Sequence, residues 1–141
     1  DVTDENCSNL FNNNYNDLFY FPTTKITYNE STTFDKEKYI NFKNIYCDSF
    51  KKIALDFIKN GGGKIFYPSS VAVKQNIQGL EEYKMAKKDG ECMCSEINKI
   101  SSIKVLVERL DRVNTDQTLT IIPTKPLDPY EVAIDIAFKM I

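Results

Sequence analysis

The stretch that decides the fold is TTFDKEKYINFKNIYCDSFKKIALDFIKNGGGKIFY, residues 32–67. Thr32–Asp35 has the Thr-x-x-Asp form of a helix N-terminal capping box. Apolar side chains then recur at spacings of three and four, which predicts one buried face of a helix over 35–60. Those positions are Tyr39, Phe42, Tyr46, Phe50, Ile53 and Phe57. Gly61–Gly63 follow the helix and precede an apparent strand at 65–67, so they indicate a helix C-cap rather than a phosphate-binding loop.

The segments outward from this stretch predict the rest of a small sheet. Residues 18–28 are rich in aromatic and β-branched side chains and indicate a strand interrupted by Pro22. Apolar residues alternate over 103–108, and with 119–122 they predict a β-hairpin. The charged segment 80–88 indicates a surface helix that ends at Asp89-Gly90.

The last predicted element is a helix over 129–141, for which Asp128 is the N-cap and Pro129 the first helical residue. Together the segments predict one α+β domain spanning 1–141. We expect a small antiparallel sheet that carries the 103–122 hairpin and packs one face against the two main helices.

Composition excludes several function classes. The 141 residues carry a net charge of −2 and no histidine, with 42% hydrophobic and 27% charged residues. Without histidine the chain lacks the usual base of Ser-His-Asp and Cys-His enzymes and the commonest metal ligand. The charge gives no general attraction to nucleic acid. No apolar run reaches 18 residues, so no transmembrane segment is expected.

Four cysteines, Cys7, Cys47, Cys92 and Cys94, predict two disulfides, as in secreted domains. Cys92 and Cys94 are too close to pair with each other, so one is expected to bond Cys7 and the other Cys47. A zinc site and free thiols are the alternatives. The sequons at Asn6 and Asn29 are candidate glycosylation sites.

Residues 46–67 resemble a segment of LCCL modules, in which a cysteine, a helix, glycines and a strand follow one another. The resemblance implies an extracellular module for adhesion or ligand binding. The central histidine and early cysteine cluster of that family are missing here. The abundance of Asn, Lys and Tyr is similar to that of secreted proteins of malaria-type parasites.

No constellation of residues indicates catalysis, so no catalytic residue, cofactor or metal is predicted. Glu81-Glu82, Asp89 and Glu91 lie in charged stretches typical of a surface. Asp135 lies between two isoleucines, which makes it the one carboxylate whose neighbours suggest burial.

The leading functional hypothesis is therefore a non-catalytic, secreted or cell-surface module that binds protein partners, such as a parasite antigen. Its expected interaction surface is aromatic and apolar. The residues are Tyr15, Tyr20, Tyr28, Phe138, Met140 and Ile141. The alternatives are a structural subunit that docks through its C-terminal helix, and an enzyme with carboxylate or lysine chemistry. The polar start at Asp1 is typical of a mature or trimmed chain, and a fragment of a longer protein is equally compatible.

Overall fold

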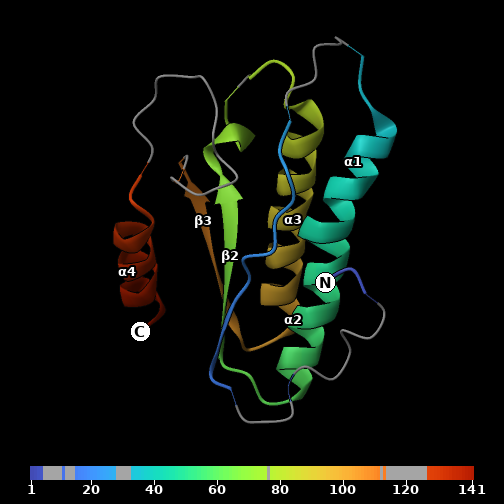
Figure 1. The fold of residues 1–141 in the computed structure, drawn as a ribbon. Coiled ribbons are helices and arrows are strands. Elements are labelled where there is room, and N and C mark those ends of the chain that lie inside the picture. Colours follow the sequence, from blue (N-terminus) through green and yellow to red (C-terminus); the bar gives the residue numbers. More distant parts are fainter. Residues whose placement is uncertain (5–10, 12–14, 28–32, 76, 112, 114–126) are drawn as a thin grey trace.

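The structure, a computed structural model, describes residues 1–4, 11, 15–27, 33–75, 77–111, 113 and 127–141, which form three layers (Figure 1). A parallel sheet lies between α4 on one face and the helices α1, α2 and α3 on the other. In chain order the elements are β1 (Asp17–Phe19), α1 (Lys36–Lys43), η2 (Asn44–Ser49), α2 (Phe50–Lys59), β2 (Lys64–Ser70), η3 (Val71–Val73), α3 (Glu81–Ile100), β3 (Lys104–Leu110) and α4 (Pro129–Met140).

The predicted antiparallel sheet is wrong. The strand order is β1-β2-β3, and both pairings are parallel, with Phe19 opposite Phe66 and Ile65 opposite Val105. Parallel pairing follows from the connections, because a helical crossover separates each strand from the next. The expected strand at 103–108 is present as β3, but it pairs with β2. Its expected hairpin partner, 119–122, lies outside the described residues.

Helices cover both faces of the sheet, not one as predicted. Ile65, Phe66 and Tyr67 are all fully buried, because successive side chains of β2 point to opposite faces. Ile65 and Tyr67 pack with Phe50, Phe57, Cys94 and Ile97 from α2 and α3. Phe66 packs with Ile136 and Met140 of α4.

The helix expected over 35–60 is confirmed, with a π-helical segment, η2, in its middle. The side chain of Asp35 caps its start by accepting a 3.0 Å hydrogen bond from the Lys38 backbone N–H. Its end is the predicted glycine cap. Gly61 has a φ of 82°, a conformation that favours glycine, and its N–H donates to the Ile58 carbonyl at 3.1 Å.

The helix expected to stop at Asp89-Gly90 instead continues to Ile100 as α3. Gly90 does not end the helix but lies where the helix closely contacts neighbouring elements. A Cβ placed there would lie 1.9 Å from the Tyr67 hydroxyl oxygen and 3.0 Å from the Tyr46 carbonyl oxygen. The helix approaches β2 and η2 this closely only because glycine has no side chain.

Candidate functional site

Ser70, Tyr83 and Lys87 come together at the edge of the sheet where its strands end. Ser70 is the last residue of β2, and Tyr83 and Lys87 lie one helical turn apart in the first half of α3. In open sheets of parallel strands, ligands bind in the crevice outside the carboxyl ends of the strands. We therefore take these three side chains as the candidate site.

Lys87 is enclosed by aromatic rings. The residue is only 5% exposed. Its side-chain amine donates a 2.7 Å hydrogen bond to the Pro68 carbonyl. The same nitrogen lies 3.9 Å from the ring centroid of Tyr46, 5.4 Å from that of Tyr67 and 5.9 Å from that of Tyr83. The closest of these distances is that of a cation–π contact.

Burial lowers the pKa of Lys87 to about 7, because the charged form loses its hydration. Glu91 favours the charged form, but its carboxylate is engaged by Arg109 at 2.6 Å. Burial also raises the pKa of the Cys47 thiol to about 12 and raises that of Cys94. Both thiols are therefore protonated at neutral pH and supply no negative charge to the lysine.

Tyr83 supplies the phenol hydroxyl of the site. Burial and the neighbouring Tyr46 raise its pKa, while a side-chain hydrogen bond with Ser70 lowers it. The Tyr83 ring packs edge-on against Phe42 and Tyr46, with centroid separations of 5.6 and 5.7 Å. At neutral pH Tyr83 is thus a protonated, firmly oriented phenol, which is the state required of a proton donor.

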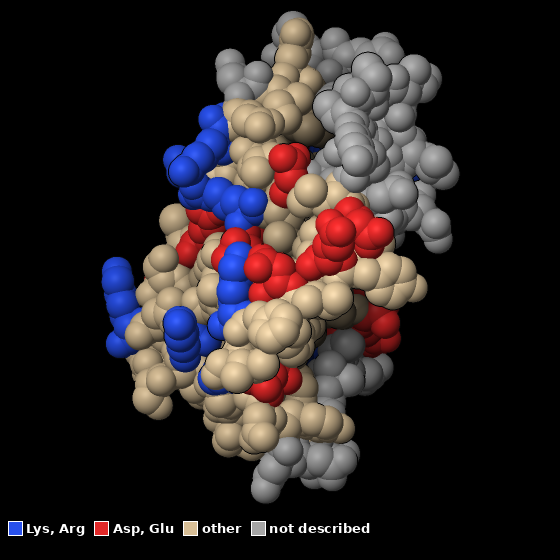
Figure 2. Space-filling view, turned by 90° about the vertical axis from the view of Figure 1, so that its left-hand side faces the viewer, with Lys and Arg blue, Asp and Glu red and all other residues tan. Residues whose placement is uncertain are grey.

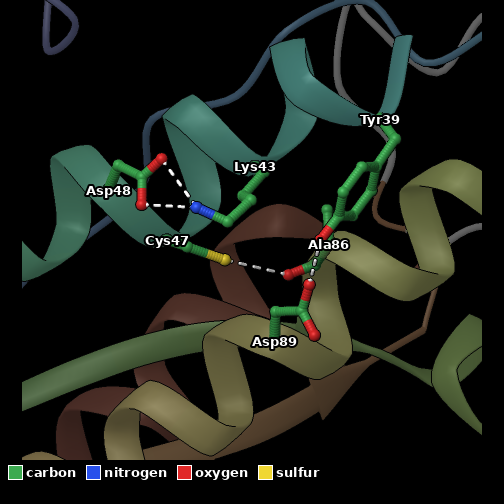
Figure 3. Close-up of polar contacts among 6 residues, drawn as sticks. All are labelled: Tyr39, Lys43, Cys47, Asp48, Ala86 and Asp89. Atoms are coloured by element: carbon green, nitrogen blue, oxygen red, sulfur yellow. Dashed lines mark hydrogen bonds and ion pairs between the residues drawn. The ribbon is translucent and has the colours of Figure 1, made fainter. Parts of the chain in front are cut away.

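Contacts between α1, η2 and α3 hold the elements of the site together (Figure 3). The Tyr39 hydroxyl donates to the Asp89 carboxylate at 2.6 Å, which raises the pKa of Tyr39 to about 12. One turn of α3 away, the Cys47 thiol donates to the Ala86 carbonyl oxygen at 3.3 Å. These two bonds fix α1 and η2, respectively, against the part of α3 that carries Tyr83 and Lys87.

The cysteines do not form the expected framework. Within the described part of the chain no disulfide is present, and Cys47, Cys92 and Cys94 are free thiols. Cys47 faces Ala86, Cys94 lies in the core between α3 and the sheet, and Cys92 points outward from α3. Cys7 lies outside the described residues. The prediction of a disulfide-stapled domain is therefore wrong.

We expect alkylation of the native protein to modify Cys92 and to spare Cys47 and Cys94, because those two thiols are buried and Cys47 in particular has a high pKa. Peptide mapping by mass spectrometry, before and after denaturation, measures this selectivity. A non-reducing digest that joined the Cys47 peptide to the Cys92–Cys94 peptide would contradict the structure.

The predicted interaction residues do not share one surface. Tyr15 and Phe138 are exposed, whereas Tyr20 is buried at 3% exposure and its hydroxyl donates to the Ile45 carbonyl at 2.5 Å. Met140, the last residue of α4, is buried in the cluster with Phe66, and Ile141 is exposed. Tyr28 and the two sequon asparagines, Asn6 and Asn29, lie outside the described residues. Binding of a protein partner stays a prediction.

The side of the molecule that carries α4 shows charges of both signs among uncharged side chains (Figure 2). Lys139 pairs there with Glu108 at 3.1 Å and with Asp135 at 2.7 Å. Asp135, considered above for burial, therefore lies in a surface ion pair.

None of the helices in the described ranges is both long and apolar enough to cross a membrane.

No protein-family model and no curated protein matches this chain. Solved structures do match. A short-chain dehydrogenase/reductase from Saccharomyces cerevisiae aligns with 99% of this chain and 60% of its own, with a TM-score of 0.72 and 13% identity. A gluconate 5-dehydrogenase from Burkholderia cenocepacia, solved with NADP and tartrate, aligns with 88% of this chain and 54% of its own, with a TM-score of 0.70 and 12% identity.

The fold is that of the short-chain dehydrogenases. An acetoin dehydrogenase from Enterobacter cloacae shares it over 89% of this chain and 55% of its own, with a TM-score of 0.63 and 17% identity. Identities this low establish the fold alone. The chain spans 54–60% of the length of these three structures.

This finding overturns the functional hypotheses drawn from sequence. The non-catalytic binding module, together with its structural-subunit alternative, is wrong, since the chain has the dehydrogenase fold. The secreted or cell-surface location rested on disulfides, and the described thiols form none. The parasite antigen, which rested on composition, is overturned with the binding module by the dehydrogenase fold. The resemblance of 46–67 to LCCL modules, and the single domain over 1–141, stay predictions.

The site residues were missed because each was interpreted by itself. The pattern of segment 80–88 predicts a surface helix, and nothing within that segment alone indicates a site. The available signal was a Tyr and a Lys four residues apart, and so on one helix face, in the helix that follows a strand ending in serines. The order strand, helix, strand, helix, strand was a second signal, since it indicates a parallel sheet.

Proposed function

We propose that this chain is part of a nicotinamide-dependent oxidoreductase that acts on a carbonyl group, with Tyr83 as its proton donor. The observation that carries the proposal is the cluster of Ser70, Tyr83 and Lys87 at the carboxyl edge of the parallel sheet. The dehydrogenase fold supports it, as does the NADP bound to one of the proteins that share this fold.

The donor chemistry of the site fits an oxygen-bearing substrate and the sugar end of a nicotinamide nucleotide. Two hydroxyls and one ammonium group gather there, and these groups donate hydrogen bonds to such oxygens. A phosphate cradle is a separate requirement. The run Gly61–Gly63 lies at the amino end of β2, at the opposite edge of the sheet, where the Gly63 and Lys64 N–H groups donate to the Asn16 carbonyl at 2.9 Å. The Gly61–Gly63 run is therefore not the phosphate cradle of this site.

The residues of the chain can perform the proton transfer that such a reduction requires. A reduced nicotinamide, when bound, would supply the hydride for the carbonyl carbon. As negative charge develops on the carbonyl oxygen, the Tyr83 hydroxyl donates its proton to it and becomes a phenolate. Ser70 orients that hydroxyl through its hydrogen bond, and a protonated Lys87 stabilises the phenolate electrostatically.

We expect Tyr83→Phe to lower the rate of carbonyl reduction at least about a hundredfold, because it removes a general acid while keeping the packed ring. The assay follows oxidation of reduced nicotinamide nucleotide by the full-length protein with a panel of small ketones and diketones.

Tyr130→Phe is the matched control. The Tyr130 side chain is 80% exposed on α4, away from the cluster, so its variant should keep the rate of the parent protein. Turnover by Tyr83→Phe equal to that of the parent would contradict the proposal. Failure of the full-length protein to bind either NADH or NADPH would contradict it as well.

A further inference from the structure

Tyr46 places its ring directly beneath the amine of Lys87. The nitrogen is 3.9 Å from the ring centroid, while the Tyr67 and Tyr83 centroids are more than 1 Å farther away. Among the described residues, that amine donates its hydrogen bond to an uncharged acceptor, the Pro68 carbonyl. We propose that Tyr46 is the positioning residue of this site, which holds Lys87 in its charged form beside Tyr83 through the face of its ring.

The backbone of η2 is built to keep the Tyr46 ring in place. A π-helical turn leaves carbonyl groups out of the normal helical pairing, and such turns are frequent at functional sites. Here two buried tyrosines bind the carbonyls: Tyr20 donates to Ile45 at 2.5 Å, and Tyr67 donates to Tyr46 at 3.0 Å. The segment is thus anchored from both β2 and the residue that follows β1.

The Tyr46 side chain is oriented as firmly as its backbone. Its hydroxyl lies 3.0 Å from the Thr23 hydroxyl, and its ring stacks on Phe42 at a centroid separation of 6.0 Å. Its edge-to-face contact with Tyr83 connects the two aromatic residues of the site. One ring therefore contacts both the lysine and the proposed proton donor.

The other titratable groups around Lys87 do not provide the same stabilisation. From α3, Glu91 is bound by Arg109 and by the Ser69 hydroxyl, and Cys94 is a buried thiol of raised pKa. From η2, Cys47 is a neutral thiol bonded to Ala86. Tyr67 from β2 and Tyr83 from α3 are phenols whose pKa burial raises. After the Pro68 carbonyl, the ring of Tyr46 is thus the nearest uncharged group described around the amine that favours its ammonium form.

The inference rests on the proposed function only for its catalytic consequence. A lysine held in the charged form stabilises the phenolate that Tyr83 leaves after proton donation. The contact itself is measurable without substrate or cofactor. The two proposals can therefore fail separately.

The test lowers the electron density on the face of the ring at position 46 while keeping the shape of the ring. The full-length protein is prepared with isotope-labelled lysine, and NMR follows the side-chain signal of Lys87 against pH, assigned with Lys87→Arg. Tyr46→Phe keeps the aromatic face, so the pKa of Lys87 should stay about 7. Trifluorophenylalanine at position 46 withdraws density from that face and should lower the pKa by about one, a tenfold loss of proton affinity.

Phe50 provides the matched control. It is fully buried and packs against Tyr20 and Tyr67 rather than against the lysine amine. Trifluorophenylalanine at position 50 should leave the pKa of Lys87 unchanged. The proposal is overturned if fluorination at position 46 leaves that pKa unchanged, or if both positions lower it equally. If Tyr46→Phe destabilises the protein but leaves the pKa of Lys87 unchanged, while the fluorinated variant lowers that pKa, the proposal is supported. A purely structural role of the ring predicts the same pKa in both position-46 variants.

Discussion

Gly90→Ala is expected to destabilise the protein by about 3 kcal/mol or more, although alanine is the better helix former. The new Cβ would lie 1.9 Å from the Tyr67 hydroxyl oxygen, 2.6 Å from its ring and 3.0 Å from the Tyr46 carbonyl oxygen. Tyr67 is fully buried and packs on Phe50 and Tyr20, so it has no room to turn away. This overlap outweighs the gain of about 1 kcal/mol in helix propensity. Urea denaturation measures the free energy of unfolding.

Two further variants identify the cause. Gly61→Ala also replaces a glycine, but its Cβ meets open space and only its φ of 82° is strained, so we expect a cost of about 1 kcal/mol. Tyr67→Phe removes the nearest clashing atom. The double variant Gly90→Ala/Tyr67→Phe should therefore be more stable than the sum of its two single variants. Strict additivity would show that α3 and β2 are not in close contact.

Lys87→Met is expected to stabilise the folded protein by about 3 kcal/mol at pH 6, because it removes a buried charge and keeps a side chain of similar length. Below pH 7 the lysine is charged in both the folded and the unfolded chain, so the folded state bears the full cost of burial. Between about pH 7 and pH 10 the unfolded chain binds more protons than the folded one, and stability of the parent protein rises with pH. The advantage of the variant should shrink over the same range.

Urea denaturation at pH 6, 8 and 10 gives both the size and the pH dependence of this effect. Lys88→Met is the matched control, since Lys88 is the exposed neighbour on the same helix and its replacement should change stability by less than about 0.5 kcal/mol. An advantage of Lys87→Met that grew with pH would contradict a lowered pKa. If the proposed function is correct, the stabilised variant should also be inactive, as is common when a strained site carries activity.

The sequence predicted the elements whose signals are local. The helix over 35–60, its Asp35 cap and its glycine end all depend on residues within a few positions of each other, and each is present. The start of α4 is equally local: the Asp128 side chain accepts a 2.7 Å hydrogen bond from the Tyr130 backbone N–H. The turn-by-turn pattern of a helix is set by neighbours three and four residues apart, so such signals are readable in the chain.

The direction of the strands was not readable in the same way. Whether β3 runs parallel or antiparallel to β2 depends on a pairing between residues 40 positions apart, such as Ile65 and Val105. The alternation at 103–108 suits either arrangement, because the two-residue period of a strand is the same in both. Only the helical crossover between the strands decides for the parallel sheet.

The candidate site shows the same division. The sequence by itself determined that Tyr83 and Lys87 share one face of a helix, because a spacing of four residues closes one helical turn. Only the tertiary structure decided that this face lies against η2 and the end of β2, where burial lowers the pKa of the lysine and Ser70 meets the phenol. It also decided that Gly90 is a contact rather than a helix end, and that Cys47 and Cys94 are buried thiols rather than halves of disulfides. Burial and proximity arise from packing between distant segments, and a pattern along the chain carries no direct record of them.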